Sequence, residues 1–285
     1  MWKLGIISWA FEAARAGFGP TQSRGVKMTL EDATRKIADM GFDGVEVIVW
    51  DVDTFDATRR KKIKEEVDSL GIEISGVGCN DNVYIWNSPV YTNPDASVRD
   101  EMVRRVGKAI EAAEEWNCDL VGLWPGSDAI PLKIPYRKAW DLLVDTFSRC
   151  AKIAEEHRIK LAVEHKPECI LGNTDSTLRL IEAVNSKYMG ALLDTGHSIV
   201  AKENLPTVVD MLGEKLFHVH IDDTYGDWDR DLPPGTIHDF TGFLKQLKQV
   251  GYKGYLSMDV WPYEDAEKEI KMGRDYMLRL LHDIE

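Results

Sequence analysis

The chain has 285 residues, of which 44% are hydrophobic, and its formal net charge is −13. A duplex nucleic acid or an anionic membrane surface needs Lys and Arg gathered on one face, so this charge argues against both as partners. The length suits one domain that spans residues 1–285 and buries a sizeable core.

The four cysteines, Cys79, Cys118, Cys150 and Cys169, stand apart and form no CxxC pair. Such spacing is typical of a reducing compartment and offers neither a disulfide framework nor a zinc knuckle. The first residues become polar too soon for a signal peptide, and no apolar run reaches the ~18 residues of a membrane span. We therefore expect a cytoplasmic protein with no membrane partner.

Short apolar runs alternate with longer segments of helical periodicity from one end of the chain to the other. This alternation predicts eight βα units around a parallel sheet, which close into a single (β/α)8 TIM barrel, an α/β fold. The predicted strands are Lys3–Ser8, Gly44–Ile48, Ile72–Val77, Leu120–Leu123, Lys160–Glu164, Met189–Asp194, Leu216–Ile221 and Gly254–Asp259. The predicted helices are Leu30–Met40, Ala57–Leu70, Val98–Trp116, Tyr136–His157, Thr174–Asn185, Leu205–Leu212, Asp239–Val250 and Tyr263–Ile284.

Several of these helices carry recognisable end signals. Thr29 with Asp32 resembles a capping box at the start of the first helix. Gly41 and Gly71 stand where the first and second helices should stop.

Four of the predicted strands, all in the second half of the chain, end in a residue that can bind a metal. These residues are Glu164, Asp194, His220 and Asp259. In a TIM barrel the active site forms at the carboxyl ends of the strands. The four residues follow one another at intervals of 30, 26 and 39 residues, near the ~31 residues of an average unit in a barrel of about 250 residues. We therefore expect them to converge on one mouth of the barrel.

Three carboxylates and one neutral imidazole form an oxygen-rich site suited to Mn²⁺, Co²⁺ or Mg²⁺, with Zn²⁺ or Fe²⁺ as alternatives. A single carboxylate at a strand end more often caps a helix or pairs with a cation. Carboxylates gathered at one mouth would repel one another without a divalent cation between them. The pattern therefore predicts a divalent metal, and Mn²⁺ is the first expectation.

Side chains alternate along a strand, so His218 and His220 share one face of the strand Leu216–Ile221. By the same rule His165 should face away from Glu164 and the mouth. We interpret His165 as a structural residue.

Several motifs resemble those of the xylose-isomerase-like sugar isomerases and epimerases, a superfamily that includes ketose 3-epimerases, inosose-processing enzymes and rhamnose isomerases. The motifs, spread over most of the chain, are Val163-Glu164-His165-Lys166-Pro167-Glu168, Leu193-Asp194-Thr195-Gly196-His197, His218-Val219-His220 and Ser257-Met258-Asp259. The resemblance implies a divalent metal held by Glu164, Asp194, His220 and Asp259. Asp259 departs from the ketose 3-epimerase pattern, which has glutamate there, and looks more like the rhamnose isomerase branch. Lys166 points to the same branch, in which a lysine on this strand reaches the substrate.

His197 lies three residues after Asp194, and the resemblance implies that this histidine contacts the sugar or a metal. Family members with two metals bind the second ion with this histidine and an Asp-x-Asp pair. Asp229 and Asp231 supply such a pair in the loop after the strand of His220. The two alternatives are a second metal held by His197, Asp229 and Asp231, or an ordinary solvated acidic loop.

Three further residues, Trp9, Trp124 and Glu46, are candidates for substrate contacts. Trp9, Trp124, Trp50 and Trp261 each follow a predicted strand, where an indole can stack on a sugar ring or simply pack in the mouth. Glu46 on the second strand can reach a substrate hydroxyl or pair with an arginine of the barrel.

The predicted function is metal-dependent isomerisation or epimerisation of a small sugar, a ketose or aldose, through a metal-bound enediolate. Glu164 is the predicted proton acceptor and Asp259 the opposing acid/base group. The sequence has no Gly-rich phosphate cradle and no cluster of Lys and Arg near the late strands, which favours an unphosphorylated substrate. A homo-oligomer is compatible with these features.

Three alternatives stand beside this function. The same site could expel a β-substituent, which would make the protein a dehydratase or lyase of a keto-sugar, keto-inositol or keto-glycoside. An endonuclease of abasic DNA would need a basic groove, against which the net charge of −13 argues. Non-catalytic sugar binding would leave the four metal-binding residues without a role.

Overall fold

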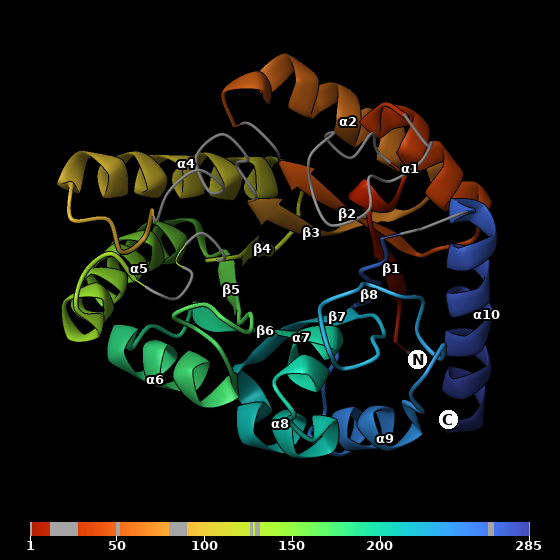
Figure 1. The fold of residues 1–285 in the computed structure, drawn as a ribbon. Helices are drawn as coiled ribbons and strands as arrows, with labels where there is room; N and C mark the ends of the chain where they lie inside the picture. The colour runs from red at the N-terminus through yellow and green to blue at the C-terminus, as the bar shows by residue number, and fades with distance from the viewer. Residues whose placement is uncertain are drawn as a thin grey trace.

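The computed structural model of the chain describes residues 2–11, 28–49, 52–79, 90–125, 128, 132–261 and 265–284. Eight parallel strands form a closed barrel in sequential order, and the last strand pairs with the first (Figure 1). This arrangement confirms the predicted (β/α)8 barrel. The strands are β1 (Leu4–Ile7), β2 (Gly44–Val49), β3 (Glu73–Cys79), β4 (Leu120–Leu123), β5 (Lys160–Glu164), β6 (Met189–Asp194), β7 (Leu216–Ile221) and β8 (Leu256–Met258).

Strands β4 to β7 have the bounds that the sequence predicts, whereas β8 is shorter at both ends. Before β8, the hydroxyl of Tyr252 donates to the carbonyl of Tyr255 at 2.8 Å, and this bond engages a backbone group that a longer ladder would use. After β8, the N–H of Asp259 donates to the carbonyl of Ile221 at 3.3 Å, so Asp259 still lies beside the end of β7.

The longer helices form a ring around the barrel in Figure 1, and the short helix α7 lies inside that ring. Each predicted helix is present, although the first residues predicted for the last one, 263 and 264, lie outside the described residues. The helices are α1 (Leu30–Asp39), α2 (Ala57–Leu70), α4 (Ala96–Glu115), α5 (Tyr136–His157), α6 (Thr174–Val184), α7 (Thr195–Val200), α8 (Leu205–Leu212), α9 (Thr241–Gln249) and α10 (Ala266–Ile284).

Local side-chain chemistry sets several helix ends. The hydroxyl of Thr29 accepts the N–H of Asp32 at 3.1 Å and caps α1, as the sequence predicts. Gly71 ends α2 with φ of 70°, a left-handed conformation that glycine adopts without strain. Helix α9 begins two residues later than predicted, because the carboxylate of Asp239 accepts both the N–H and the hydroxyl of Thr241.

The hydrophobic core fills the barrel and the layer between the barrel and its helices. Ile6, Val45, Val121, Leu161 and Val219 come from five different strands, and each is fully buried. Burying one such side chain stabilises the fold by ~1.5–3 kcal/mol. A polar side chain inside this layer forgoes that gain and loses its hydration, so it needs a partner or a ligand.

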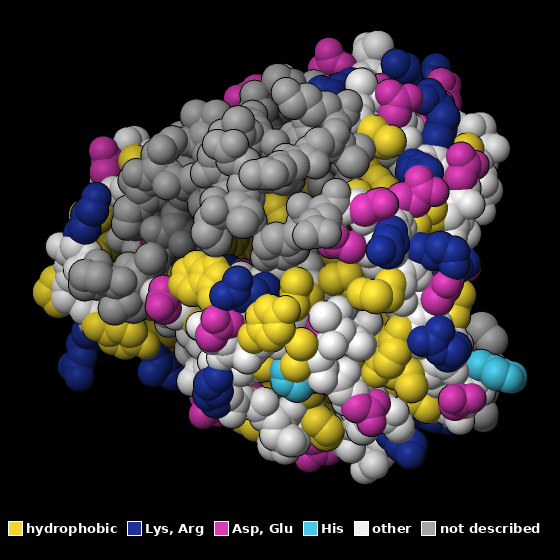
Figure 2. All heavy atoms as spheres, turned by 45° about the vertical axis from the view of Figure 1, so that its right-hand side comes forward, with side chains coloured by type: hydrophobic (Ala, Val, Ile, Leu, Met, Phe, Trp, Pro, Cys, Tyr) yellow, Lys and Arg dark blue, Asp and Glu magenta, His cyan; other side chains and the backbone are white. Residues whose placement is uncertain are grey.

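The described part of the face in Figure 2 carries Lys and Arg side chains interspersed with Asp and Glu. Oppositely charged side chains pair elsewhere in the described residues too: Arg60 and Glu115 are joined by two hydrogen bonds of 2.7 and 2.8 Å. None of the helices in the described residues is long and apolar enough to cross a membrane.

Candidate metal centre and active site

The four residues predicted to bind a metal come together at the mouth of the barrel. Each offers one ligand atom, and these atoms all lie within 4.8 Å of one another. All four side chains are buried. β5, β6 and β7 supply three of them, and the fourth follows β8 directly; they are Glu164, Asp194, His220 and Asp259.

These four residues are called the metal quartet below. The carboxylates of three of them surround the Nδ1 atom of the fourth, His220. Carboxylate oxygens of Asp259, Glu164 and Asp194 lie 3.4, 3.8 and 3.9 Å from this nitrogen. Neither His220 Nδ1 nor Asp194 Oδ2 has a hydrogen-bond partner, although both atoms are buried. Buried polar atoms are nearly always paired, so two such atoms without a partner fit a site that could hold a ligand. Three carboxylates and an imidazole nitrogen are a suitable donor set for a divalent cation.

Burial and mutual charge move the pKa values of the quartet in opposite directions. Burial disfavours the charged form of Glu164, but the imidazoles of His197 and His220 outweigh it and lower the pKa of Glu164 to about 2. Burial, reinforced by the charges of Glu164 and Asp259, raises the pKa of Asp194 to about 7, although His197 opposes this rise. Without a cation the site therefore holds an ionised Glu164 beside a carboxyl group that retains its proton up to neutral pH.

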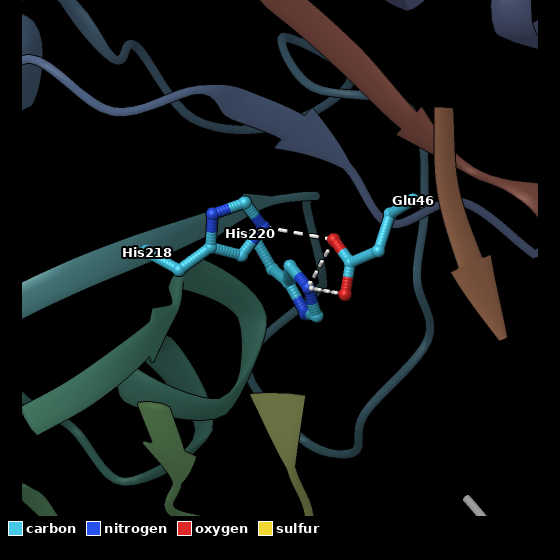
Figure 3. Close-up of side chains that lie close together, drawn as sticks. All are labelled: Glu46, His218 and His220. Atoms are coloured by element: carbon cyan, nitrogen blue, oxygen red, sulfur yellow. Dashed lines mark hydrogen bonds and ion pairs between the residues drawn. The ribbon is translucent and has the colours of Figure 1, made fainter. Parts of the chain in front are cut away.

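A buried carboxylate faces the imidazoles of His218 and His220, as Figure 3 shows. Glu46 of β2 accepts from His218 Nε2 at 2.8 Å and lies 3.1 and 3.2 Å from His220 Nε2. From the sequence, Glu46 is predicted to contact the substrate or to pair with an arginine, whereas the structure pairs it with two imidazoles of β7. The strand alternation did place His218 and His220 on one face, and only their partner across the barrel was missed.

His197 lies one turn into α7, next to the quartet. Asp194 caps this helix, because its Oδ1 atom accepts the N–H of His197 at 2.7 Å. The ring of His197 bridges two carboxylates: Nδ1 lies 3.1 Å from Glu164 Oε1, and Nε2 lies 3.1 Å from Asp229 Oδ2. The helix was not predicted, since its six residues are too few to show a helical period.

Lys166, which lies just after the end of β5, contacts both Asp229 and His197. Its ammonium forms an ion pair with Asp229 and lies 3.1 Å from His197 Nε2. The charges of Asp229 and Asp231 overcome the effect of burial and raise the pKa of Lys166, so the side chain is a cation. The indole of Trp124 lies 5.6 Å from this ammonium.

A second acidic group forms in the loop after β7. Carboxylate oxygens of Asp222, Asp229 and Asp231 lie within 4.8 Å of one another. The sequence predicted the last two but not Asp222, whose Oδ1 atom accepts the N–H of Gly196 at 2.7 Å and contacts the hydroxyl of Thr195 at 3.0 Å. Its Oδ2 atom and Asp229 Oδ1 are buried without partners. Burial and the surrounding carboxylates raise the pKa of Asp222.

The predicted tryptophans make specific contacts where they are described. Trp9 donates its indole N–H to Asp259 Oδ1 at 2.8 Å and meets the ring of Trp261 edge-on, with centroids 5.8 Å apart. Trp50 lies outside the described residues. His165 is buried 3.3 Å from the hydroxyl of Ser198, away from the quartet, as the alternation of β5 predicts.

Comparisons with known proteins agree with this architecture. An uncharacterized protein of Methanocaldococcus jannaschii is 26% identical over 260 residues, which cover 87% of this chain and 85% of that protein. The fructoselysine 3-epimerase of Shigella flexneri is 24% identical over 242 residues, which cover 82% and 86%. The crystal structure of a D-tagatose 3-epimerase-like protein has a TM-score of 0.79 at 25% identity, and the match covers 99% of this chain and 100% of that one.

The family described as xylose isomerase-like TIM barrel matches residues 34–280. This match covers all strands of the barrel but the first and contains every residue of the quartet. The resemblance seen in the motifs is thereby confirmed, and the chain belongs to the xylose isomerase-like TIM barrel family.

Proposed function

We propose that this protein is a divalent-metal-dependent isomerase or epimerase of a small unphosphorylated sugar, a ketose or an aldose. The observation that carries the proposal is the buried quartet, in which three carboxylates face an imidazole nitrogen that has no hydrogen-bond partner. The relatives support the reaction class, since one is named as a 3-epimerase and one as epimerase-like.

Four side chains would hold the cation, which is Mn²⁺ by first preference and Co²⁺, Mg²⁺, Zn²⁺ or Fe²⁺ by the same donor chemistry. They are Glu164, Asp194, His220 and Asp259. When bound, a divalent cation acts as a Lewis acid that polarises a carbonyl group and stabilises the negative charge that develops on its oxygen. Asp194 would bind the cation through Oδ2, because its Oδ1 atom accepts the N–H of His197 and caps α7.

Two carboxylates of the quartet can also move a proton. Glu164 is ionised, because the imidazoles of His197 and His220 lower its pKa to about 2 against the effect of burial. As an ionised carboxylate, Glu164 can accept the proton from the carbon beside the substrate carbonyl. The pKa of Asp259 is raised by burial, so this residue is suited to return a proton. Epimerisation requires the return on the opposite face, and isomerisation requires it at the neighbouring carbon.

Lys166 and His197 are placed to bind substrate oxygens beside the quartet. The ammonium of Lys166 donates hydrogen bonds and carries a positive charge, while the indole of Trp124 lies next to it as an apolar surface. His197 Nε2 lies 3.1 Å from both Lys166 Nζ and Asp229 Oδ2. We assign Lys166, His197 and Trp124 to substrate binding, because a sugar offers hydroxyl groups on its edge and C–H groups on its faces.

A second cation at Asp229 and Asp231 is the alternative arrangement of the site. We favour one cation, because the Lys166 ammonium already forms an ion pair with Asp229 and contacts His197. A divalent ion bound by these residues would be repelled by that ammonium. Lys166 therefore provides the positive charge that the second ion would bring.

The direct test is a substrate screen with mass analysis. The protein, loaded with Mn²⁺, is incubated with common aldoses, ketoses and keto-inositols, and the products are separated by chromatography. We expect a product of the same mass as its substrate, formed by the loaded protein and not by the EDTA-treated protein. A product that has lost the mass of one water, or of an aglycone, would replace this proposal with a dehydratase or lyase. Binding without any product would leave a sugar-binding protein.

A further inference from the structure

The interior of the barrel holds a charged side chain where a packed barrel normally has branched apolar residues. Glu46 is 1% exposed and belongs to β2, whereas its two partners, His218 and His220, belong to β7 (Figure 3). These strands are not neighbours in the sheet, so the carboxylate spans the barrel interior to reach the imidazoles. An unpaired carboxylate at this depth would be strongly destabilising.

The neighbouring strands leave room for this carboxylate. A β-carbon added at Gly76 of β3 would lie 3.3 Å from Cδ of Glu46, and one added at Gly122 of β4 would lie 3.7 Å from its Oε1 atom. Alanine at Gly76 would therefore press on Glu46, because contacts of 3.3 Å are tighter than a β-carbon usually makes. Glycine at this position of β3 thus preserves the place of the side chain.

The hydrogen bonds of this cluster distinguish the two ring nitrogens of His220. Its Nε2 atom lies 3.1 and 3.2 Å from the oxygens of Glu46, whereas its Nδ1 atom has no hydrogen-bond partner and faces the carboxylates of the quartet. An ionised carboxylate only accepts hydrogen bonds, so the proton between Glu46 and His220 lies on Nε2. A cation takes the place of any proton on Nδ1, and an imidazole whose remaining proton lies on Nε2 presents the lone pair of Nδ1 to that cation.

His218, two residues before His220 on the same strand, also contacts Glu46. Its Nε2 atom donates to Glu46 Oε2 at 2.8 Å, and the two rings meet edge to face with centroids 5.3 Å apart. The carboxylate of Glu46 is thereby held in one orientation by His218 while it binds His220.

Glu46, His218 and His220 could in principle hold a cation of their own. Their donor atoms, however, are paired with one another at 2.8 to 3.2 Å. Among the described residues, the buried side-chain atoms that lack a partner include His220 Nδ1 but no atom of Glu46 or His218. The contacts within the cluster occupy these donor atoms. The nitrogen that remains without a partner is Nδ1 of His220, which faces the quartet.

We propose that Glu46 is a positioning residue for the metal centre: it accepts the Nε2–H of His220, fixes the ring and its tautomer, and so presents Nδ1 to the cation. This inference rests on the proposed function only for the presence of the cation. Carboxylates that bind the far nitrogen of a metal-ligating histidine raise its basicity, and their removal typically reduces metal affinity by about 10–100-fold.

The first test is the Glu46→Gln variant, which keeps the side-chain size but replaces one oxygen by an NH₂ group. Both rings contact Oε2 of Glu46 and His220 also contacts Oε1, so a glutamine in either orientation turns its NH₂ group toward at least one imidazole N–H. We expect Mn²⁺ affinity, measured by titration calorimetry, to fall by about 10–100-fold. Gly76→Ala should weaken binding in the same direction, because it displaces Glu46 without changing a polar group.

The matched control is Ser75→Ala, which alters a buried side chain of β3 inside the barrel. It should leave Mn²⁺ affinity unchanged. Equal affinity in the wild type and in Glu46→Gln would overturn the role of Glu46 and leave the proposed function standing. The loss of a second, separate Mn²⁺ ion from Glu46→Gln would also overturn it, because Glu46 would then be a ligand.

The second test reads the tautomer directly and does not depend on activity. Protein labelled with ¹⁵N-histidine is studied by NMR with and without diamagnetic Zn²⁺, and the His220 signals are identified by their loss in His220→Asn. We expect a proton on Nε2 in both states and a Zn²⁺-dependent shift at Nδ1. An Nε2 atom without a proton, or one that responds to Zn²⁺ as the ligand, would refute the inference. Failure of the wild type to bind any cation would refute the proposed function, and the metal-free spectrum would still report on Glu46.

Discussion

Trp9 donates its indole N–H to Oδ1 of Asp259 at 2.8 Å and so links the short segment after the first strand to the residue that directly follows the last. The other oxygen of this carboxylate, Oδ2, lies 3.4 Å from His220 Nδ1 within the quartet. The closure of the barrel therefore places a hydrogen-bond donor behind a proposed metal ligand. Trp9 acts on the site through Asp259 in this arrangement, in addition to any contact with the sugar.

Replacing Trp9 by phenylalanine should weaken metal binding. The change keeps an aromatic ring but removes the N–H that orients Asp259, and a hydrogen bond to a charged group contributes about 1.5–3 kcal/mol. We expect Mn²⁺ affinity to fall roughly tenfold or more, measured by calorimetric titration. Trp261→Phe is the control, because it alters the neighbouring indole and should have a much smaller effect. Equal losses in the two variants would indicate general packing.

Removal of the metal should lower thermal stability. A cation that binds only the folded state stabilises it by ~2.7 kcal/mol at a concentration of 100 Kd. For a chain of this size that corresponds to a Tm shift of roughly 4–5 °C. Calorimetry of EDTA-treated protein, before and after Mn²⁺ is returned, measures the shift, and Asp194→Asn should abolish most of it. A Tm that does not respond, with metal content far below one ion per chain, would contradict the metal centre.

Glu164→Gln should stop turnover and leave the fold intact. The substitution keeps the size of a buried side chain but removes its charge and its ability to accept a proton. General base catalysis contributes about 10²–10⁴-fold, so kcat should fall by at least that factor. Glu168→Gln is a matched control on the exposed loop that follows the same strand. Wild-type rates in Glu164→Gln would remove this residue from the mechanism, provided its circular dichroism and melting curve are native.

Metal affinity should depend on pH through Asp194. Burial and the neighbouring carboxylates raise the pKa of this group to about 7 in the cation-free site. Below that pH the carboxyl group holds a proton that a cation must displace, so apparent affinity should fall about tenfold per pH unit. Above it the group is ionised, so the contribution of Asp194 to the pH dependence ends. Titrations between about pH 5 and pH 8 measure this slope, and a flat profile would contradict the raised pKa.

The barrel could be predicted from the sequence because the evidence for it lies in short segments of the chain. Apolar runs and helical segments alternate, and the polar residues at strand ends follow from the alternation of side chains along β5 to β7. The contact of Glu46 with His218 spans 172 residues and depends on side chains that cross the barrel interior. Such a pairing follows from strand register and from the space left at Gly76, neither of which a single sequence displays.

The loop after β7 illustrates a second limit. Asp229 and Asp231 were recognised by their Asp-x-Asp spacing, whereas Asp222 belongs to no such motif. Its position is set by a tertiary contact, in which it accepts the N–H of Gly196 at the start of α7. The six residues of α7 are in turn too few to reveal a helical period. Residues that act through short helices and loops therefore require the structure.

The number of cations can be decided at Asp229 and Asp231. If these residues hold a second ion, their joint change to asparagine should remove about one ion per chain and lower activity by orders of magnitude. If Lys166 is the only cation there, the metal content should stay the same. The change would then leave the Lys166 ammonium without its ion-pair partner, so substrate binding should weaken, and a further Lys166→Met change should restore stability by removing the unpaired charge.

The reaction in D₂O gives an independent answer, because proton transfer through Glu164 introduces deuterium into the product and a direct shift of hydrogen between carbons does not. We expect deuterium incorporation and an unchanged metal count, since the ammonium already lies against Asp229 and His197. A deuterium-free product together with the loss of one ion would establish the two-metal arrangement instead.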